Sequence, residues 1–265
     1  MIYYTCKPGW ENMLTCIYDA WSSRKGHKNI KLLLEPIDQY TLFDEYIHVE
    51  GDALKAEKLM DAINDKLSAY FYRELMYASM AYEEDVLDTI YRCLILGFAY
   101  GNYVLSQVQY RDIMRFRQIR TRVGKEVNHF QEFIRFHRMD NDVYVAHFEP
   151  KSRIAVSEGY IFQDRMPSEN WIIVDDIHRE AVIHPKDQNF YLQMLSPEEY
   201  ADLLKTEDSN DRYTQMWKNY FDTIAIEQRR NIRCQNNLFP KWTRKHVVEF
   251  NEVKYTDIVA DTIKE

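Results

Sequence analysis

The chain has 265 residues, 46% of them hydrophobic, with only seven glycines and seven prolines. This length and composition support a sizeable buried core in one or two domains and exclude a disordered chain. The formal net charge of −8 at pH 7 argues against nonspecific binding of nucleic acid by the whole surface.

Targeting signals and a disulfide framework are missing from the sequence. No apolar run reaches the length of a membrane span, and the first ten residues lack the basic and apolar segments of a signal peptide. The cysteines are separated widely, without CxxC spacing, at Cys6, Cys16, Cys93 and Cys234. We therefore expect a cytoplasmic protein without membrane contact.

Residues 1–105 are predicted to be mainly helical. Apolar residues recur there at helical spacing, and Asp52 and Ser68 stand where N-caps are expected. The expected elements are a strand at 2–5, helices at 11–22, after Asp52, after Ser68 and between Val86 and Gly101, and extended segments at 32–34 and 43–49.

One long basic helix is predicted at residues 106–131. Residues 111–138 hold eight Lys or Arg against three Asp or Glu, and many of these cations recur on one side of the helix. Aligned cations can follow phosphates, although a solvated face paired with neighbouring acids explains the pattern equally well. The stripe consists of Arg111, Arg115, Gln118, Arg122, Lys125 and His129.

Residues 132–190 are predicted to form two antiparallel hairpins. Residues 133–139 and 143–148 alternate around one polar turn, and residues 171–175 and 179–184 alternate around another. Helices return in residues 191–265, where Pro197 suits a first helical turn. The predicted fold class is α+β, with helical N- and C-terminal parts around a small antiparallel sheet, in a single interlocked unit.

A second basic segment lies at residues 227–246, with six Lys or Arg against one Glu. Cations interleaved with aromatic rings suit single-stranded or unpaired nucleic acid, because charge follows the backbone while rings stack on bases. A basic helix end that complements the helix dipole is the alternative. The candidate binding residues are Arg229, Arg230, Arg233, Trp242 and Arg244.

Four charged residues of the hairpin region are candidates for a catalytic site. Arg135 stands between two apolar residues of an expected strand, and it could pair with Asp164 or Asp175 or hold a phosphate. Asp175 and Arg179 supply further opposite charges. A structural network of ion pairs between the hairpins is the competing interpretation.

The sequence does not predict a metal site or a cofactor. His129, His137, His147, His178 and His184 are numerous, but they lack HExxH or HxH spacing. Nucleophile elbows and the glycine-rich loops that hold phosphates are also missing. We expect no cofactor in the chain itself.

Several short motifs occur at residues 133–136, 144–146, Glu149-Pro150, Asp164-Arg165, 171–175 with Arg179, Trp217, Phe221, 224–226, Arg230-Asn231, Gln235 and Pro240. Together they resemble the uncharacterised bacterial DNA metabolism/repair protein family. Its members are encoded beside a radical-SAM protein or are fused to a uracil-DNA-glycosylase-like domain. The similarity is strongest between residues 120 and 245 and implies a role in DNA metabolism with a radical-SAM partner.

This chain departs from the family pattern at several positions. The pattern E-x-H-[RK]-x-x-G-F-[LI]-R-F has a histidine where Asn128 stands and a glycine where Glu132 stands. A second histidine of the pattern is replaced by Ile161. An activity that depends on these histidines in relatives is not expected here.

Three hypotheses remain open on the sequence alone. The first is an accessory protein of DNA metabolism that binds DNA, a radical-SAM partner or both through its cationic surfaces. The second is an enzyme that acts on damaged DNA bases with Arg135, Asp164, Asp175 and Arg179 in its site. The third is a protein–protein adaptor that does not contact nucleic acid.

Overall fold

The computed structural model describes residues 1–37, 39–139, 142–204 and 212–250, without the side chains of residues 212–215 and 227. The chain divides into two compact units, Met1–Lys125 (unit 1) and Glu126–Glu265 (unit 2). The expectation of one interlocked unit stays a prediction. None of the helices in the described part has the length and apolarity that a membrane crossing needs.

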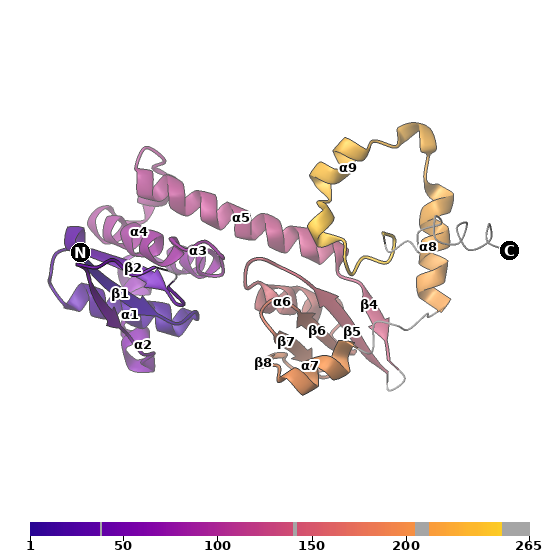
Figure 1. Cartoon of the computed structure of the whole chain (residues 1–265), viewed down its shortest axis with the longest axis horizontal. Coiled ribbons are helices and arrows are strands. Elements are labelled where there is room, and N and C mark those ends of the chain that lie inside the picture. The colour runs from indigo at the N-terminus through magenta and orange to yellow at the C-terminus, as the bar shows by residue number, and fades with distance from the viewer. Residues whose placement is uncertain (38, 140–141, 205–211, 251–265) are drawn as a thin grey trace. The chain divides into compact units, whose positions relative to one another are not determined.

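Unit 1 contains a parallel sheet in addition to its helices. The central strand β1 has a parallel neighbour on each side, with Ile2 opposite Ile30 in one register and opposite Glu45 in the other. The three extended segments expected from the sequence are therefore strands of one sheet (Figure 1). Their bounds are β1 Ile2–Cys6, β2 Ile30–Leu34 and β3 Glu45–His48.

The helices of unit 1 begin where the sequence places N-caps. The Asp52 side chain accepts hydrogen bonds from the backbone N–H groups of Leu54 and Lys55, and Ser68 accepts one from Phe71. These bonds satisfy donors that the first helical turn leaves unpaired. The elements are α1 Trp10–Ser22, η1 His27–Asn29, α2 Ala53–Lys66, α3 Ala69–Ser79, α4 Val86–Tyr100 and η2 Asn102–Ser106.

Helix α5 (Arg111–Phe133) is continuous from unit 1 into unit 2. It begins five residues later than the sequence predicts, because η2 and a turn occupy the residues before Arg111. A stripe of apolar residues on this helix is buried, as expected for a helix that packs along one face. The stripe comprises Ile113, Phe116, Val123, Val127 and Phe130.

The sheet of unit 2 has five strands in the order β4-β5-β6-β7-β8. Both predicted hairpins are present, since β4 pairs antiparallel with β5 and β6 pairs antiparallel with β7. The prediction of a purely antiparallel two-hairpin sheet is wrong, because β5 and β6 are parallel neighbours and β8 adds a fifth strand. The bounds are β4 Phe136–Arg138, β5 Val143–Phe148, β6 Asn170–Asp175, β7 Glu180–His184 and β8 Tyr191–Met194.

Helix α6 (Ala155–Arg165) causes this difference, because a parallel pair needs a crossover connection. It lies on one face of the sheet, where Gly159 of the helix contacts Val182 of β7. A Cβ atom added to Gly159 would lie only 2.8 Å from a methyl group of Val182. Helix α7 covers the other face, where Tyr200 and Leu203 pack against a buried cluster that includes Val145. The remaining helices are α7 Pro197–Leu204, α8 Arg212–Ile224, η4 Glu227–Arg229, α9 Ile232–Leu238 and η5 Lys241–Thr243.

Candidate functional site

A group of polar side chains lies at the carboxyl ends of β5 and β6 in unit 2. Strand β5 ends at Phe148 and β6 ends at Asp175, and Glu149 and Asp176 follow them directly. Parallel strands end at the same edge of a sheet, and α/β proteins bind their ligands at that edge. The residues after these two strands are therefore the first place to search for chemistry.

Asp176 is the centre of this group and is buried together with His147 on β5. Its Oδ1 atom lies 3.0 Å from His147 Nδ1, and its Oδ2 atom lies 3.0 Å from His246 Nε2. Burial alone would raise the pKa of the Asp176 carboxyl, but hydrogen bonds to the two histidines outweigh burial and hold the pKa well below its usual value. Asp176 is thus a buried carboxylate that stays charged.

The two ring nitrogens of His147 have different surroundings, and Nδ1 is the one bonded to Asp176. A neutral imidazole that donates Nδ1–H to a carboxylate keeps a lone pair on Nε2. His147 Nε2 is buried and lacks a hydrogen-bond partner among the described residues. His147 can therefore accept a proton at Nε2 while Asp176 stabilises the resulting imidazolium.

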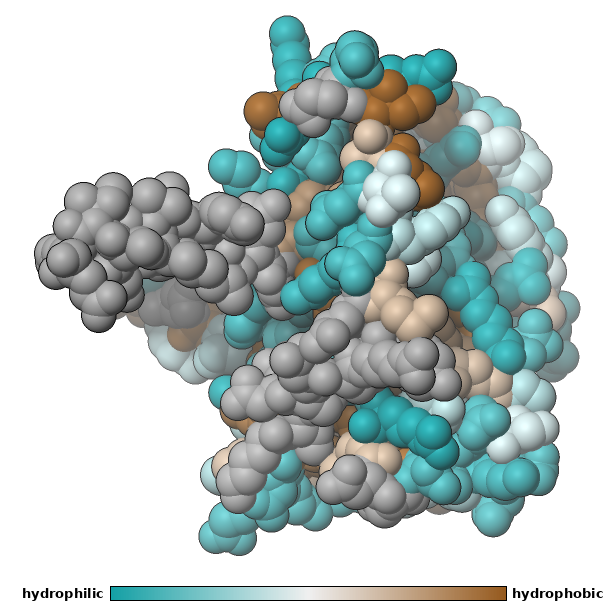
Figure 2. Space-filling view, turned by 90° about the vertical axis from the view of Figure 1, so that its right-hand side faces the viewer, coloured by the Kyte–Doolittle hydropathy of each residue, from teal (hydrophilic) through white to brown (hydrophobic). Residues whose placement is uncertain are grey.

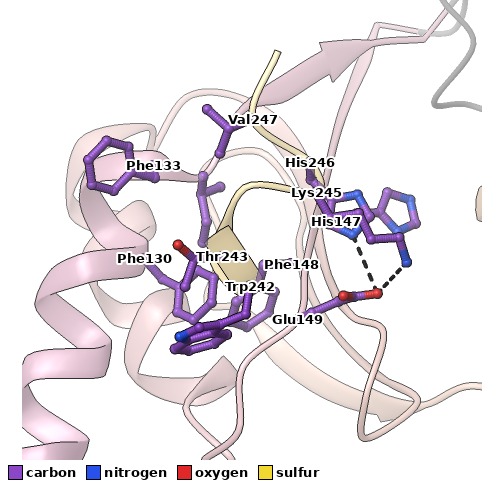
Figure 3. Close-up of a pocket in the computed structure, with 11 residues that line it drawn as sticks. Phe130, Phe133, His147, Phe148, Glu149, Trp242, Thr243, Lys245, His246 and Val247 are labelled. Carbon is purple, nitrogen blue, oxygen red and sulfur yellow. Dashed lines mark hydrogen bonds and ion pairs between the residues drawn. The ribbon is translucent and has the colours of Figure 1, made fainter. Parts of the chain in front are cut away.

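A small cavity lies beside His147 and His246, with a volume of about 10 Å³. This volume is close to the space that one water molecule occupies. Figure 3 shows His147, His246, Lys245 and Glu149 on one side of the cavity and aromatic rings, including Phe130, on the other. The polar side of the cavity brings an imidazole, a carboxylate and an ammonium group together around a water-sized space.

His246 reaches this site because the segment 239–249 packs back onto α5 and the segment that follows it. Thr243 Oγ1 lies 2.8 Å from His129 Nε2, and the rings of Phe239 and Phe133 stack 4.0 Å apart. Six residues after Thr243, Glu249 accepts a hydrogen bond from Arg135 at 2.7 Å. The site is therefore assembled from two strand ends and a segment that is distant from both of them along the chain.

Two cationic side chains, Lys245 and Arg179, lie on the segments that form the site. The Lys245 ammonium pairs with Glu149, and the Lys245 side chain is 61% exposed. Arg179 lies 3.6 Å above the ring of Tyr200. Burial, and after it the nearby Asp176 charge, raises the pKa of Tyr200 to about 12, so its hydroxyl stays protonated. This arrangement suits an anionic substrate.

A second acid–histidine group lies in the turn between β6 and β7. Asp175 Oδ1 accepts hydrogen bonds from the backbone N–H groups of Ile177 and His178, and its Oδ2 atom lies 2.6 Å from His178 Nδ1. Glu180 pairs with Arg153 at 3.0 Å, and burial raises the pKa of Glu180 despite this partner. Because Asp175 bonds to residues of its own turn, this group stabilises the turn.

Within the described part of the chain, two sets of side chains have the spacing to hold a cation. Within each set the ligand atoms lie within 4.8 Å of one another, and carboxylate oxygens with an imidazole are common ligands of divalent metals. The linear spacing of histidines does not reveal these sets, because distant segments supply the ligands. The sets are Glu149 with Asp176 and His246, and Asp175 with His178 and Glu180.

The four predicted catalytic residues do not lie together. Arg135 follows α5 and pairs with Glu249, not with Asp164 or Asp175 as the sequence suggested. Asp164 is exposed on α6, whereas Asp175 is fully buried. Arg179, with φ of 56°, shares the β6–β7 turn with Asp175. Only Asp175 and Arg179 therefore lie at the strand ends, and a catalytic role for any of the four stays a prediction.

The predicted nucleic-acid-binding residues of unit 1 differ in their partners. Arg115 donates two hydrogen bonds to Asp85, at 2.7 and 2.6 Å, and Arg122 donates one to Glu83 at 2.8 Å. Arg111 and Lys125 are exposed. The alternative of a face paired with neighbouring acids therefore holds for Arg115 and Arg122.

Among the predicted binding residues of unit 2, some are bonded within the fold and others are exposed. His129 bonds to Thr243, and Arg244 donates hydrogen bonds to Gln235, Asn236 and Phe239, so both support the local fold. Trp242 is 42% exposed, with the Lys151 ammonium 4.9 Å from its ring centre. The exposed cations are Arg229, Arg230 and Arg233.

Sequence reasoning missed the residues at the centre of the site. Glu149 and Asp176 each follow an apolar strand, and that position would have identified them if β5 and β6 had been recognised as parallel. His147 lies among the buried residues of β5, and recognition of the parallel strands would have identified it as well. His246 carried none, because only the folded segment brings it to Asp176.

The sequence model of DUF4130, a domain of unknown function, matches residues 84–249 of this chain. The matched stretch begins just before α4, includes α5 and contains every residue of the Asp176 site. No curated protein matches the chain. Since the match covers more than half of its residues, the chain belongs to the DUF4130 family of domains of unknown function.

Proposed function

We propose that this chain is a hydrolase of nucleic-acid metabolism whose general base is His147. The observation that carries the proposal is the buried pair of His147 and Asp176 beside a water-sized cavity. An imidazole oriented by a buried carboxylate is a common general base, and it works best when its free nitrogen faces the proton it removes.

In the proposed reaction, His147 Nε2 takes a proton from a water molecule as its oxygen attacks the phosphorus of a phosphodiester. The bond from phosphorus to the leaving sugar oxygen breaks, and that oxygen takes a proton from bulk water. Asp176 keeps the imidazole in the required tautomer and stabilises its positive charge. His246, on the other oxygen of Asp176, keeps that carboxylate in place.

Nucleic acid is the proposed substrate for two reasons. The motifs shared with the DNA metabolism/repair protein family support it, and the cations Lys245 and Arg179 on the segments that form the site favour a substrate with negative charge. Lys245 and Arg179 are both exposed, so they can contact phosphate oxygens without a change of fold.

The test is turnover of fluorescein-labelled single-stranded DNA, duplex DNA and RNA, with products separated on a denaturing gel. Glutamine can keep a hydrogen bond to Asp176 but cannot accept a proton, so His147→Gln should lower the rate by roughly 10²- to 10⁴-fold. The matched control is His178→Gln, which changes an imidazole bonded to Asp175 and should leave the rate unchanged. Equal rates for wild type and His147→Gln, with circular dichroism showing both folded, would refute the proposal.

An accessory role with a protein partner, such as a radical-SAM protein, is the second candidate. Helices α8 and α9 and the residues between them expose large apolar side chains, and Figure 2 shows brown hydrophobic atoms among hydrophilic ones on the face it presents. Co-purification with the radical-SAM protein of the same genome should weaken in Ile232→Lys if this surface binds it; unchanged recovery would exclude the surface. The exposed residues are Met216, Trp217, Tyr220, Ile224, Ile226, Ile232 and Leu238.

A further inference from the structure

An open groove lies in unit 1 between α3, η2 and α5. Its volume is about 690 Å³, within the range of sites that bind molecules of nucleotide size. Its lining combines aromatic and cationic side chains, a combination that the sequence did not reveal because three separate elements supply it. The tyrosines and arginines are Tyr70, Tyr77, Tyr103, Arg73, Arg117 and Arg120.

Two of these tyrosines have rings available for stacking. Tyr70 on α3 is 54% exposed and Tyr103 on η2 is 61% exposed. The Arg73 guanidinium lies 5.6 Å from the centre of the Tyr70 ring. Exposed rings beside a guanidinium are the surface on which unpaired bases stack.

The arginines of the groove differ in their availability. Arg120 bonds to Glu74 at 2.8 Å and lies 5.0 Å from the centre of the Tyr77 ring, so it belongs to the wall of the groove. Arg73 and Arg117 are exposed. Three arginines against one glutamate give the lining a charge of +2, which favours a phosphate-bearing ligand.

We propose that this groove binds nucleotide units of single-stranded nucleic acid, with bases against Tyr70 and Tyr103 and phosphates at Arg73 and Arg117. Duplex DNA hides the faces of its bases, so rings exposed in a groove favour an unpaired strand over a duplex. The choice of nucleic acid rests on the proposed function. The groove itself lies wholly in unit 1, whereas the hydrolytic site lies in unit 2.

The probe is a 5′-fluorescein-labelled oligothymidylate, whose binding to the full chain is followed by fluorescence anisotropy at several salt concentrations. Tyr103→Ala and Tyr70→Ala should each weaken binding by roughly five- to a hundredfold, the range that follows from the loss of one stacked base. Arg117→Glu should weaken binding further and should lower the dependence of affinity on salt, because a phosphate contact is lost.

Matched controls separate the groove from general effects of charge and ring removal. Tyr40 is an equally exposed tyrosine outside the groove, and Arg111 is an exposed cation on the same helix as Arg117. Tyr40→Ala should bind as the wild type does, and Arg111→Glu should lose less affinity than Arg117→Glu. Equal affinity of Tyr103→Ala and wild type, or equal losses for the two arginine variants, would overturn the proposal.

Two further arms complete the test. Displacement of the probe by thymidine monophosphate assigns the groove to free nucleotides, whereas resistance to displacement assigns it to a strand, and both results support a nucleotide site. His147→Gln should bind the probe normally. Loss of turnover with normal binding would support both proposals, while normal binding without any turnover in the wild type would remove the hydrolase and leave the groove.

Discussion

Two buried carboxylates of unit 2 have opposite electrostatic states. Asp176, at the end of β6, lies between two histidines, and hydrogen bonds to them outweigh the effect of burial and lower its pKa. Glu158, on α6, is fully buried, and neither of its oxygens has a hydrogen-bond partner among the described residues. Burial therefore raises the pKa of Glu158 to about 8.

The comparison shows that burial raises the pKa of a carboxyl and that hydrogen-bonded partners can reverse this effect. Glu180 is intermediate, because Arg153 bonds to it and yet burial still raises its pKa. A charged carboxylate can orient an imidazole and stabilise its cation, whereas a protonated one cannot. This is why we assign the chemistry to the strand ends and not to α6.

Glu158→Gln should have the largest effect on stability among the variants that test this comparison. Between about pH 4.5 and pH 8, folded Glu158 keeps a proton that the unfolded chain releases, so stability falls as pH rises through this window. A glutamine stays neutral, and the stability of the variant relative to wild type should be greater at pH 9 than at pH 4 by on the order of 5 kcal/mol. Urea unfolding at both pH values measures the difference.

Asp176→Asn is the contrasting control for that measurement. The lowered pKa of Asp176 gives wild type a stability that is present above the unfolded pKa of about 4 and is lost at more acidic pH. The asparagine variant should lack this acid-dependent loss and should be less stable than wild type at pH 7. If both substitutions change the free energy of unfolding in the same direction at pH 9, the comparison of the two carboxylates is wrong.

Local structure was predictable from the sequence where neighbouring residues determine it. The caps Asp52 and Ser68 and the strands of both hairpins follow from residue types at fixed spacing. The parallel pairing of β5 with β6 was not predicted, because α6 carries polar residues and a glycine that weaken its helical pattern. Without that helix, the hairpins looked like one antiparallel sheet.

The candidate site was harder to predict than the fold because its residues are distant in sequence. Asp175 and Arg179 were identified because they share a turn, and such short-range pairs are visible in a sequence. The pairing of Asp176 with His246 joins residues 70 positions apart, and no local pattern signals it. The same limit explains why Arg135 was assigned to Asp164 or Asp175 instead of Glu249.

The smallest effect concerns a third buried carboxylate, Glu83 in unit 1. Glu83 is largely buried, and Arg122 donates to its Oε1 atom at 2.8 Å, while its Oε2 atom has no hydrogen-bond partner among the described residues. Arg122→Gln should lower the free energy of unfolding by about 1 kcal/mol. The loss is modest because the arginine side chain is more than half exposed. Thermal unfolding at neutral pH measures it.

The matched variant is Arg111→Gln, which removes an exposed cation from the same helix and should leave the unfolding temperature unchanged. A lower unfolding temperature for Arg122→Gln alone would show that this arginine stabilises unit 1, because the buried Glu83 carboxylate loses its cation in the variant. Equal unfolding temperatures for the two variants would mean that Glu83 needs no partner. Partners would then not explain why buried acids differ, and the contrast between Asp176 and Glu158 would need another cause.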